Sequence, residues 1–279
     1  MNNTAADLLQ ELQEGVRNYL NSSRYTEWLT AVSRFHHYSF NNICLILMQY
    51  PGATQVASFR TWKQLGCYVR KGEKGIRILV PVPVRIQKVS EDESEDTNCK
   101  EDAVLRFKVG HVFDISQVDG ELPDPGIREL TENMDGFLQF LQTARSISPV
   151  PIRFDPDIPG TARGYYDLKD QEIVIRDHMP QAQTAKTILH ELAHAFMHAD
   201  ANSKKRDRAT KEVQAESVAF ICSRTLLGLE SVGDYSFGYI GTWSSSLKAK
   251  ELIASLKEIR DTSDFLIRKF QDPLEKGDI

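Results

Sequence analysis

The stretch His190-Glu191-Leu192-Ala193-His194 decides the architecture that we expect for the rest of the chain. Residues four apart lie one turn apart on the same face of an α-helix, so both imidazoles point at one place. This is the H-E-x-x-H pattern, in which two histidines hold a divalent zinc ion and the glutamate accepts a proton from the water that the metal activates. A helix that carries two unrelated surface histidines beside a glutamate is the alternative that the pentapeptide alone leaves open.

The residues around this stretch have the pattern of a partly buried helix. Pro180 suits a first helical turn, and the apolar residues Ile188, Leu189, Leu192 and Phe196 recur at the spacing of one helical face. We therefore expect a helix that has one buried stripe and that carries both histidines.

A second helix with an acidic face is predicted downstream. It begins at residues 211–216 (KEVQAE), stops at Gly228, and has Glu212 and Glu216 on one face. This E-x-x-A-E pattern after H-E-x-x-H resembles the glutamate zincins. The resemblance implies that Glu212 is the third zinc ligand and that Glu216 orients a ligand histidine. A solvated acidic face is one alternative, and an exchange of these two roles is another.

His198 lies one turn beyond His194 and raises the question of a three-histidine site. A site of the metzincin type needs the pattern H-E-x-x-H-x-x-G-x-x-H, and the chain lacks the glycine turn at this place. We therefore interpret His198 as a cation at the C-terminal end of the helix, where its positive charge would interact favourably with the helix dipole.

Length and composition are those of a soluble globular protein. The 279 residues suffice for two domains, and 41% hydrophobic with 26% charged residues excludes a disordered or fibrous class. The four cysteines form no C-x-x-C pair, which argues against a disulfide framework and a cysteine zinc site and fits a reducing cytosol. We find neither a secretion signal nor an apolar run that could span a bilayer, so we expect a cytoplasmic protein without a membrane partner.

The first half of the chain predicts short helices followed by strands. Apolar periodicity indicates helices over residues 4–20, 24–35, 43–49 and 59–66. The segment 71–75 (KGEKG) is interpreted as a hairpin turn between strands, and residues 103–115 as a further strand. Residues 91–102 hold seven acidic residues and one lysine and are expected to form a hairpin tip.

A basic stretch with interleaved aromatic residues predicts a nucleic-acid-binding face. Residues 60–88 carry eight lysines and arginines and one glutamate, in a chain whose net charge is −5. Faces that bind single strands use cations for phosphates and aromatic planes for bases. A solvated basic edge that prevents strand association is the alternative. The candidate residues are Arg60, Trp62, Lys63, Tyr68, Arg70, Lys71, Lys74 and Arg77.

The second half predicts the order helix, strands, metal helix and ligand helix, which is the layout of the zincins. We expect a helix over residues 130–141, a strand over 151–154, a hairpin formed by 164–166 and 172–176, and a C-terminal helix over 247–259. A substrate strand would add to the edge at residues 172–176.

An aromatic segment, residues 234–243, precedes the C-terminal helix. Its Tyr239 is a candidate for stabilising an oxyanion in the metal site. Packing against the C-terminal helix is the alternative interpretation of these aromatic residues.

The chain resembles the ArdC-type antirestriction proteins over nearly its whole length. For the N-terminal single-stranded-DNA-binding domain, the resemblance rests on residues 33–42, 59–66 (FRTWKQLG), 69–75 (VRKGEKG) and 112–117 (VFDISQ). The HELAH and KEVQAE motifs resemble the metallopeptidase domain of that family, which is similar to ImmA/IrrE-type peptidases. The resemblance implies DNA binding on mobile genetic elements and protection of entering DNA from restriction enzymes.

We therefore predict an α+β protein with two domains. Residues 1–122 would form a domain of helices and a β-hairpin that binds single-stranded DNA. Residues 127–279 would form a zincin-like metallopeptidase domain with one zinc ion per chain, held by His190, His194 and Glu212, and with a protein or peptide substrate.

Two other functions stay open at this point. One is a DNA-binding shield in which the metal is purely structural, and the other is a regulatory peptidase that cleaves a repressor or another DNA-bound protein. The presence of Glu191 argues against the first, because a structural metal site needs no base.

Overall fold

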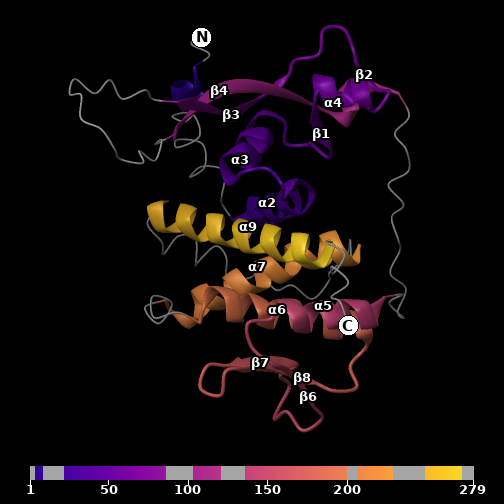
Figure 1. Cartoon of the computed structure of the whole chain (residues 1–279), viewed down its shortest axis with the longest axis vertical. Coiled ribbons are helices and arrows are strands. Elements are labelled where there is room, and N and C mark those ends of the chain that lie inside the picture. The colour runs from indigo at the N-terminus through magenta and orange to yellow at the C-terminus, as the bar shows by residue number, and fades with distance from the viewer. Residues whose placement is uncertain are drawn as a thin grey trace, which may run out of the picture. The chain divides into compact units, whose positions relative to one another are not determined.

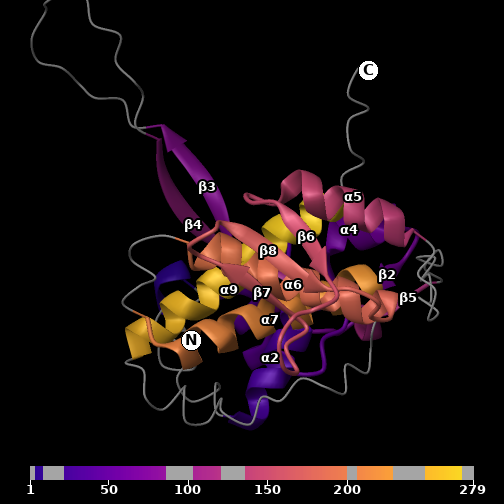
Figure 2. The same cartoon turned by 90° about the horizontal axis from the view of Figure 1, so that it is seen from below.

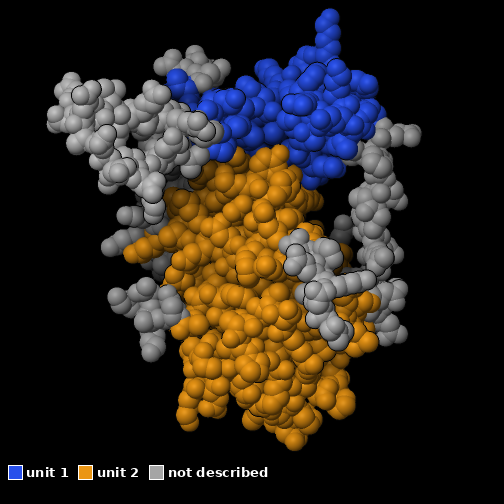
Figure 3. All heavy atoms as spheres, in the orientation of Figure 1, with its two compact units in different colours: residues 1–18, 44–122 blue, residues 19–43, 123–279 orange. Residues whose placement is uncertain are grey.

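The computed structural model describes residues 4–8, 22–85, 103–120, 136–199, 206–228 and 249–271 (Figure 1). Helices and strands are mixed along the chain, as the predicted α+β class requires. The chain divides into two compact units, residues 1–18 with 44–122 and residues 19–43 with 123–279 (Figure 3). The predicted domain boundary around residues 122–127 stays a prediction, and the units differ from it in that residues 19–43 belong to the second.

Two of the predicted N-terminal helices are described over most of their length. Helix α2 (Ser22–Phe35) lies in the second unit, and α3 (Phe40–Gln49) crosses from the second unit into the first. The hydroxyl of Ser39 accepts a hydrogen bond from the backbone N–H of Asn42 and caps α3, which begins at Phe40 and not at the predicted residue 43. Of the predicted helix over residues 4–20, residues 5–8 are helical and residues 9–20 lie outside the described residues.

The first unit is built on an antiparallel sheet with the strand order β1-β4-β3. Strand β3 (Ile76–Arg85) pairs along its whole length with β4 (Ala103–Asp114), and β1 (Val56–Ser58) pairs with the last residues of β4. The predicted strand over residues 103–115 is therefore present as one arm of a long hairpin. The acidic tip over residues 91–102 lies outside the described residues.

The sequence predicted a hairpin turn at the KGEKG segment, and this prediction is wrong. Strand β2 (Tyr68–Val69) pairs with β5 (Val118–Asp119) in a separate sheet, whereas Ile76 begins β3 in the first sheet. The segment thus connects two sheets. Glycines that flank charged residues mark a change of direction, but they do not determine which strand the chain pairs with next, so the sequence could not separate the two cases.

The motif over residues 114–117 holds the connections of the first unit in place. The carboxylate of Asp114, 1% exposed, accepts hydrogen bonds from the backbone N–H groups of Thr54 at 2.8 Å and Ser116 at 3.0 Å. The amide of Gln117 donates to Glu73 at 3.1 Å and to the backbone carbonyl of Lys74 at 3.0 Å. Burial opposes ionisation of Asp114, but the hydrogen bonds outweigh it and lower the pKa of this carboxyl.

Trp62 belongs to the core of the first unit. It lies on helix α4 (Phe59–Gln64), whose first turn is capped by the hydroxyl of Ser58. Its side chain is fully buried, and its indole N–H donates a hydrogen bond of 2.8 Å to the carbonyl of Phe113. A fully buried ring cannot stack on a base, so the structure favours the alternative role of Trp62 as a core residue over a place on a DNA-binding face. Burial depends on how α4 packs on the sheet, and the aromatic residue in a basic stretch carries no signal of that.

Replacing Trp62 should unfold the first unit before it affects binding. We expect Trp62→Ala to lower the free energy of unfolding by about 3–5 kcal/mol, the usual cost of removing a buried aromatic side chain. Tyr68→Ala is the matched control, because Tyr68 is 61% exposed and its removal should cost less than about 1 kcal/mol. Urea unfolding followed by circular dichroism measures both. A Trp62→Ala protein that unfolds like wild type would contradict the core assignment.

The second unit packs a helical layer against a small sheet. Its further helices are α5 (Phe137–Ile147), α6 (Gln181–Met197), α7 (Arg208–Leu227) and α9 (Ala249–Gln271). The sheet lies on one side of α6, and α7 and α9 lie on the other (Figures 1 and 2). The predicted metal helix is therefore the central element of this unit. No helix among the described residues is both long and apolar enough to cross a membrane.

The sheet of the second unit has the strand order β6-β8-β7. Strand β8 (Glu172–Arg176) pairs in parallel with β6 (Ile152–Asp155) and antiparallel with β7 (Gly164–Asp167), which confirms the predicted hairpin. Since β8 is central, the prediction that a substrate strand adds to residues 172–176 is wrong. The edge strand that contacts α6 is β7. Three consecutive strands can be ordered in several ways, and the sequence does not choose among them.

Candidate metal centre

Helix α6 brings His190, Glu191 and His194 together. Its buried stripe, which includes Ile188 and Leu192, is 0% exposed, whereas the two histidine side chains are 19% and 15% exposed. The Nε2 atoms of His190 and His194 lie 3.1 Å apart. The spacing of four residues therefore places both imidazole nitrogens at one point, as the sequence predicted.

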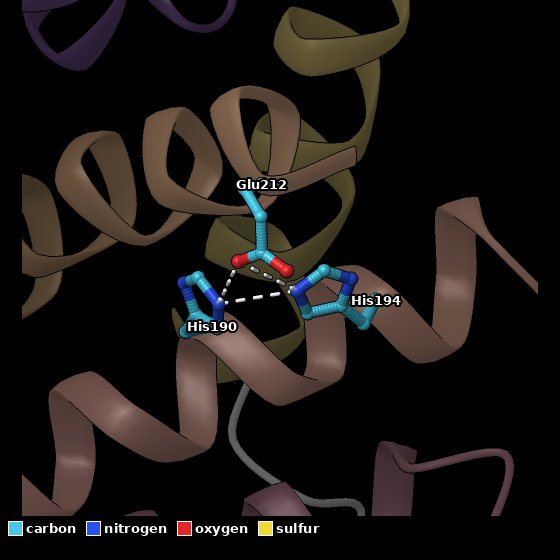
Figure 4. Close-up of side chains that lie close together, drawn as sticks. All are labelled: His190, His194 and Glu212. Atoms are coloured by element: carbon cyan, nitrogen blue, oxygen red, sulfur yellow. Dashed lines mark hydrogen bonds and ion pairs between the residues drawn. The ribbon is translucent and has the colours of Figure 1, made fainter. Parts of the chain in front are cut away.

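Helix α7 supplies the carboxylates. It begins at Arg208, three residues before the predicted start, because Asp207 caps it by accepting a hydrogen bond of 2.6 Å from the N–H of Thr210. Glu212 follows one turn later, and its Oε2 lies 3.6 Å from Nε2 of His190 and 3.7 Å from Nε2 of His194 (Figure 4). The helix ends before Gly228, which adopts the left-handed conformation of a helix C-terminus.

These three atoms have the spacing and the chemistry of a metal site. In a tetrahedral zinc site with bonds of about 2.0–2.1 Å, the ligand atoms lie roughly 3.3 Å from one another. The observed separations of 3.1, 3.6 and 3.7 Å surround that value. Imidazole and carboxylate both bind zinc, so the donor set fits the ion. Within the described part of the chain, His190, His194 and Glu212 are the one group of three with this arrangement.

The imidazoles and the carboxylate of this group stabilise each other's charged forms. Hydrogen bonds to His190 and His194 lower the pKa of Glu212, and partial burial opposes this. Burial disfavours the imidazolium of His190, but hydrogen bonds to Glu212 and Glu216 outweigh it and raise the pKa of His190 to about 10. A divalent cation would take the place of these protons, so its affinity for the site should increase with pH.

Glu216 contacts the other nitrogen of His190. Its Oε2 lies 3.1 Å from Nδ1 of His190, while Nε2 of the same ring faces Glu212 and His194. With this geometry, Glu212 has the place of a ligand and Glu216 the place of a group that orients the ring. An exchange of the two roles would require the imidazole of His190 to turn over.

Glu191 lies beside the group of three and is not a member of it. Its side chain is 5% exposed, and burial raises the pKa of its carboxyl, while the nearby imidazoles and a hydrogen bond from the backbone of Tyr166 in β7 lower it. The net effect is a raised pKa. A carboxyl group whose pKa lies closer to neutrality is a better general base and acid.

His198 has a different role from the one that the sequence predicted. It is 2% exposed, and burial lowers its pKa to about 4, so it is neutral and not the expected helix-terminal cation. Its Nδ1 lies 2.9 Å from Nδ1 of His194, and its Nε2 lies 3.0 Å from Oε1 of Gln214. If His194 binds the metal through Nε2, its Nδ1–H donates to His198, and the Nε2–H of His198 donates to Gln214.

This hydrogen-bond chain continues to α9. The amide nitrogen of Gln214 donates to Ser255 at 2.7 Å and to Glu258 at 3.2 Å, and Arg206 donates to both Gln214 and Glu258. This support for His194 was not predicted from the sequence. His198 is four residues from His194, which indicates that both lie on one face of a helix. Gln214 lies on α7, and no local sequence pattern pairs it with His198.

The predicted oxyanion-stabilising residue, Tyr239, lies outside the described residues, so its role stays a prediction.

The predicted DNA-binding residues of the first unit fall into two groups. Arg70 is tied to the protein by hydrogen bonds to Glu73 and to the backbone carbonyl of Ser116, and Arg77 bonds to the side chain of Gln49. These two are therefore partly used in holding the fold. The remaining cations and Tyr68 are exposed, together with Phe59, an aromatic residue that is 56% exposed and was not among the candidates. The exposed cations are Arg60, Lys63, Lys71 and Lys74.

Two protein-family models match the chain, one in each half. Residues 1–113 match the family model described as the N-terminal domain of the anti-restriction factor ArdC. Residues 150–223 match the model of the IrrE N-terminal-like domain of the M78 peptidases, and this range contains the whole candidate metal centre.

Comparison with individual proteins agrees with the family models. An uncharacterized protein of Bacillus anthracis, pXO2-81, is 24% identical over 94% of this chain, which spans half the length of that relative. Two crystal structures of the antirestriction protein ArdC from plasmid R388 have the same fold. The metal-free one covers 84% of this chain and 85% of its own at 22% identity and a TM-score of 0.52. The Mn(II)-bound one covers 96% and 98% at 20% identity and a TM-score of 0.57.

Proposed function

We propose that this chain is an antirestriction protein of the ArdC type, that its first unit binds single-stranded DNA and that its second unit is a zinc-dependent peptidase. The match of residues 1–113 to the ArdC N-terminal domain and of residues 150–223 to the M78 peptidase domain supports this proposal. One observation carries the enzymatic half of this proposal. Two imidazole nitrogens and one carboxylate oxygen converge within 3.1–3.7 Å, beside a buried glutamate with a raised pKa that is not one of the three.

The roles of the residues follow from this arrangement. His190, His194 and Glu212 would hold the ion, and Glu216 and His198 would fix the two imidazoles in the tautomers that binding needs. The bound ion would supply Lewis-acid polarisation of a carbonyl and would make a water molecule more acidic. Glu191 would accept the proton of that water and later donate a proton to the leaving amine.

The edge strand β7 gives the peptidase site a place for its substrate. Tyr166 of this strand donates a backbone hydrogen bond to Glu191, so the strand and the candidate base are in contact. An extended peptide can add to an exposed sheet edge through main-chain hydrogen bonds. We propose that the substrate backbone lies along β7 and thereby brings a peptide carbonyl group beside Glu191 and the three residues that would hold the ion.

A purely structural metal is less consistent with the geometry. Structural zinc sites have four protein ligands, and catalytic sites keep one position open. Among the described residues three ligands are present, and Glu191, a buried glutamate outside this group, lies beside them. We test the enzymatic proposal by incubating the zinc-loaded chain with its own Glu191→Gln variant and with DNA-bound proteins, in the presence and absence of single-stranded DNA. New fragments that appear with wild type and not with Glu191→Gln alone would support it.

Single-stranded DNA should bind with a strong dependence on salt. The exposed Arg60, Lys63, Lys71 and Lys74 supply four phosphate contacts in this proposal. Counterion release gives a slope of about −0.7 per contact in a plot of log affinity against log salt, so we expect a slope of about −3. Fluorescence anisotropy with a labelled oligonucleotide measures it. Lys63→Ala and Lys71→Ala should each reduce the slope by about 0.7.

Two further variants separate stacking and general charge effects. Tyr68→Ala should weaken binding by about 1–3 kcal/mol if its exposed ring stacks on a base. Lys269→Ala, an exposed lysine at the end of α9 in the second unit, is the charge control and should leave the slope unchanged. A wild-type slope near zero, or equal effects of Lys63→Ala and Lys269→Ala, would exclude the proposed DNA-binding face.

A further inference from the structure

We propose that the peptidase site accepts acidic peptides, with aspartate or glutamate on both sides of the bond that is cut. This inference rests on the proposed peptidase function and adds the substrate class to it. Two cavities of the second unit open on either side of the metal centre, and the charged residues around them carry the argument.

The first cavity has a volume of about 470 Å³ and lies between α6 and the beginning of β7. His190, Glu191 and Glu216 of the metal centre form its floor. Its other charged residues are Arg163, which directly precedes β7, and Lys186, one helical turn before His190 on α6. Both are cations, and Arg163 is exposed.

The second cavity has a volume of about 620 Å³ and lies on the side of His194 and Glu212. Tyr165 and Leu168 form an apolar part of its wall. Its charged residues outside the metal centre are three cations from the start of α7 and the residues just before it, Arg206, Arg208 and Lys211. Arg206 is paired with Glu258 at 2.8 Å, whereas Arg208 and Lys211 form no ion pair with any residue that the structure describes.

The distribution of charge in the two cavities is one-sided. The acidic lining residues, Glu191, Glu212 and Glu216, all belong to the metal centre, where imidazoles and a divalent ion would balance them. Among the residues that the structure describes, every other charged lining residue is basic, although the net charge of the chain is −5. A concave site lined by charge of one sign focuses the electric field and concentrates ligands of the opposite sign.

The strand at the edge of the site favours a peptide over a nucleic acid strand. β7 contributes Gly164 and Tyr165 to the cavity walls, and among the strands that the structure describes it is an edge strand, the kind of strand with which an extended main chain can pair. β7 also packs closely on α6, since a Cβ atom at Gly164 would lie 2.8 Å from the side chain of Thr187. A peptide along β7 would cross the metal centre and place its flanking side chains beside the cations of both cavities.

The test compares two fluorescent peptides with the same neutral centre, one flanked by glutamates and the other by lysines. Binding is measured by anisotropy with the zinc-loaded Glu191→Gln protein, and cleavage is measured with zinc-loaded wild type. We expect the glutamate peptide to bind at least about tenfold more tightly in low salt, with the difference decreasing as salt screens the charges.

Charge reversal locates the effect in the two cavities. Arg163→Glu tests the first cavity and Arg208→Glu the second. Each should weaken binding of the glutamate peptide by about three- to tenfold, because repulsion replaces the attraction of an exposed pair, and each should strengthen binding of the lysine peptide. Lys269→Glu on α9 is the matched control, since this exposed lysine lines neither cavity, and it should change neither affinity. Zinc content is measured for all three variants so that a lost metal is recognised.

The outcomes separate this inference from the function on which it rests. If wild type cleaves neither peptide, but the glutamate peptide binds and responds to both reversals, the peptidase proposal fails and the acidic-ligand inference holds. If both peptides bind equally, or the reversals act no more strongly than Lys269→Glu, the inference is overturned. It is also overturned if the reversals weaken a single-stranded oligonucleotide while the glutamate peptide does not bind, because the cavities then serve nucleic acid.

Discussion

His190→Ala and His194→Ala should each bring the chain from one zinc ion per molecule to almost none after dialysis. Three protein ligands hold a catalytic zinc, and total binding free energies of structural sites are about 10–16 kcal/mol. The loss of one ligand of three therefore costs several kcal/mol, which weakens the affinity roughly a thousandfold. Elemental analysis after dialysis, and competition with a chelator of known affinity, measure the change.

Graded controls distinguish ligands from the residues that orient them. Glu212→Ala should behave like the histidine variants, because its Oε2 lies 3.6 and 3.7 Å from their Nε2 atoms. Glu216→Ala and His198→Ala should lower zinc affinity only about 10- to 100-fold, since each removes a hydrogen bond to a ligand ring. His111→Ala, an exposed histidine on β4 of the first unit, should have no effect.

Two results would contradict this assignment. Full zinc content in a protein that lacks both His190 and His194 would place the site elsewhere. A greater loss in Glu216→Ala than in Glu212→Ala would reverse the two glutamates. Loading of the same variants with Mn(II), the ion in one crystal structure of ArdC from R388, gives a second measurement of the site. An N,N,O site should prefer zinc to manganese when both are present in equal amounts.

The parts of the centre that lie on one helix were the most predictable from sequence. His190 and His194 are four residues apart, and helix geometry alone brings their Nε2 atoms to 3.1 Å. Glu212 lies on a second helix, so its assignment needed the resemblance to a known motif. The contact of His198 with Gln214 joins two helices, and no sequence motif indicates it. The position of His198 at the end of the helix led instead to the prediction of a charged ring.

The errors in the first unit have the same physical origin. Trp62 occurs in a basic stretch with exposed neighbours, yet it is buried because α4 packs onto the end of β4, where the carbonyl of Phe113 accepts a hydrogen bond from its indole N–H. The KGEKG segment contains the glycines of a turn, but the pairing of β2 with β5 depends on residues about 50 positions away. Local patterns determine helices and strands, whereas partners and burial are properties of the assembled unit.

Glu191→Gln should abolish hydrolysis while the metal centre and the fold stay intact. Glutamine has the shape of glutamate but cannot accept a proton, and loss of a general base costs about 10²- to 10⁴-fold in rate. Its amide oxygen can accept the hydrogen bond that the backbone of Tyr166 gives to Glu191, so the buried group keeps its partner. Zinc content should equal that of wild type, because Glu191 is outside the group of three ligands.

Three measurements on the same preparation decide this prediction: the cleavage rate of the glutamate-flanked peptide, zinc per chain, and affinity for single-stranded DNA. Glu216→Gln is the matched control, since it makes the same chemical change in a residue that orients His190. Its rate should recover when zinc is raised to saturation, whereas the rate of Glu191→Gln should not. A Glu191→Gln protein that cleaves at the wild-type rate would contradict the role of Glu191 as a general base. The alternative of a purely structural metal would then be favoured.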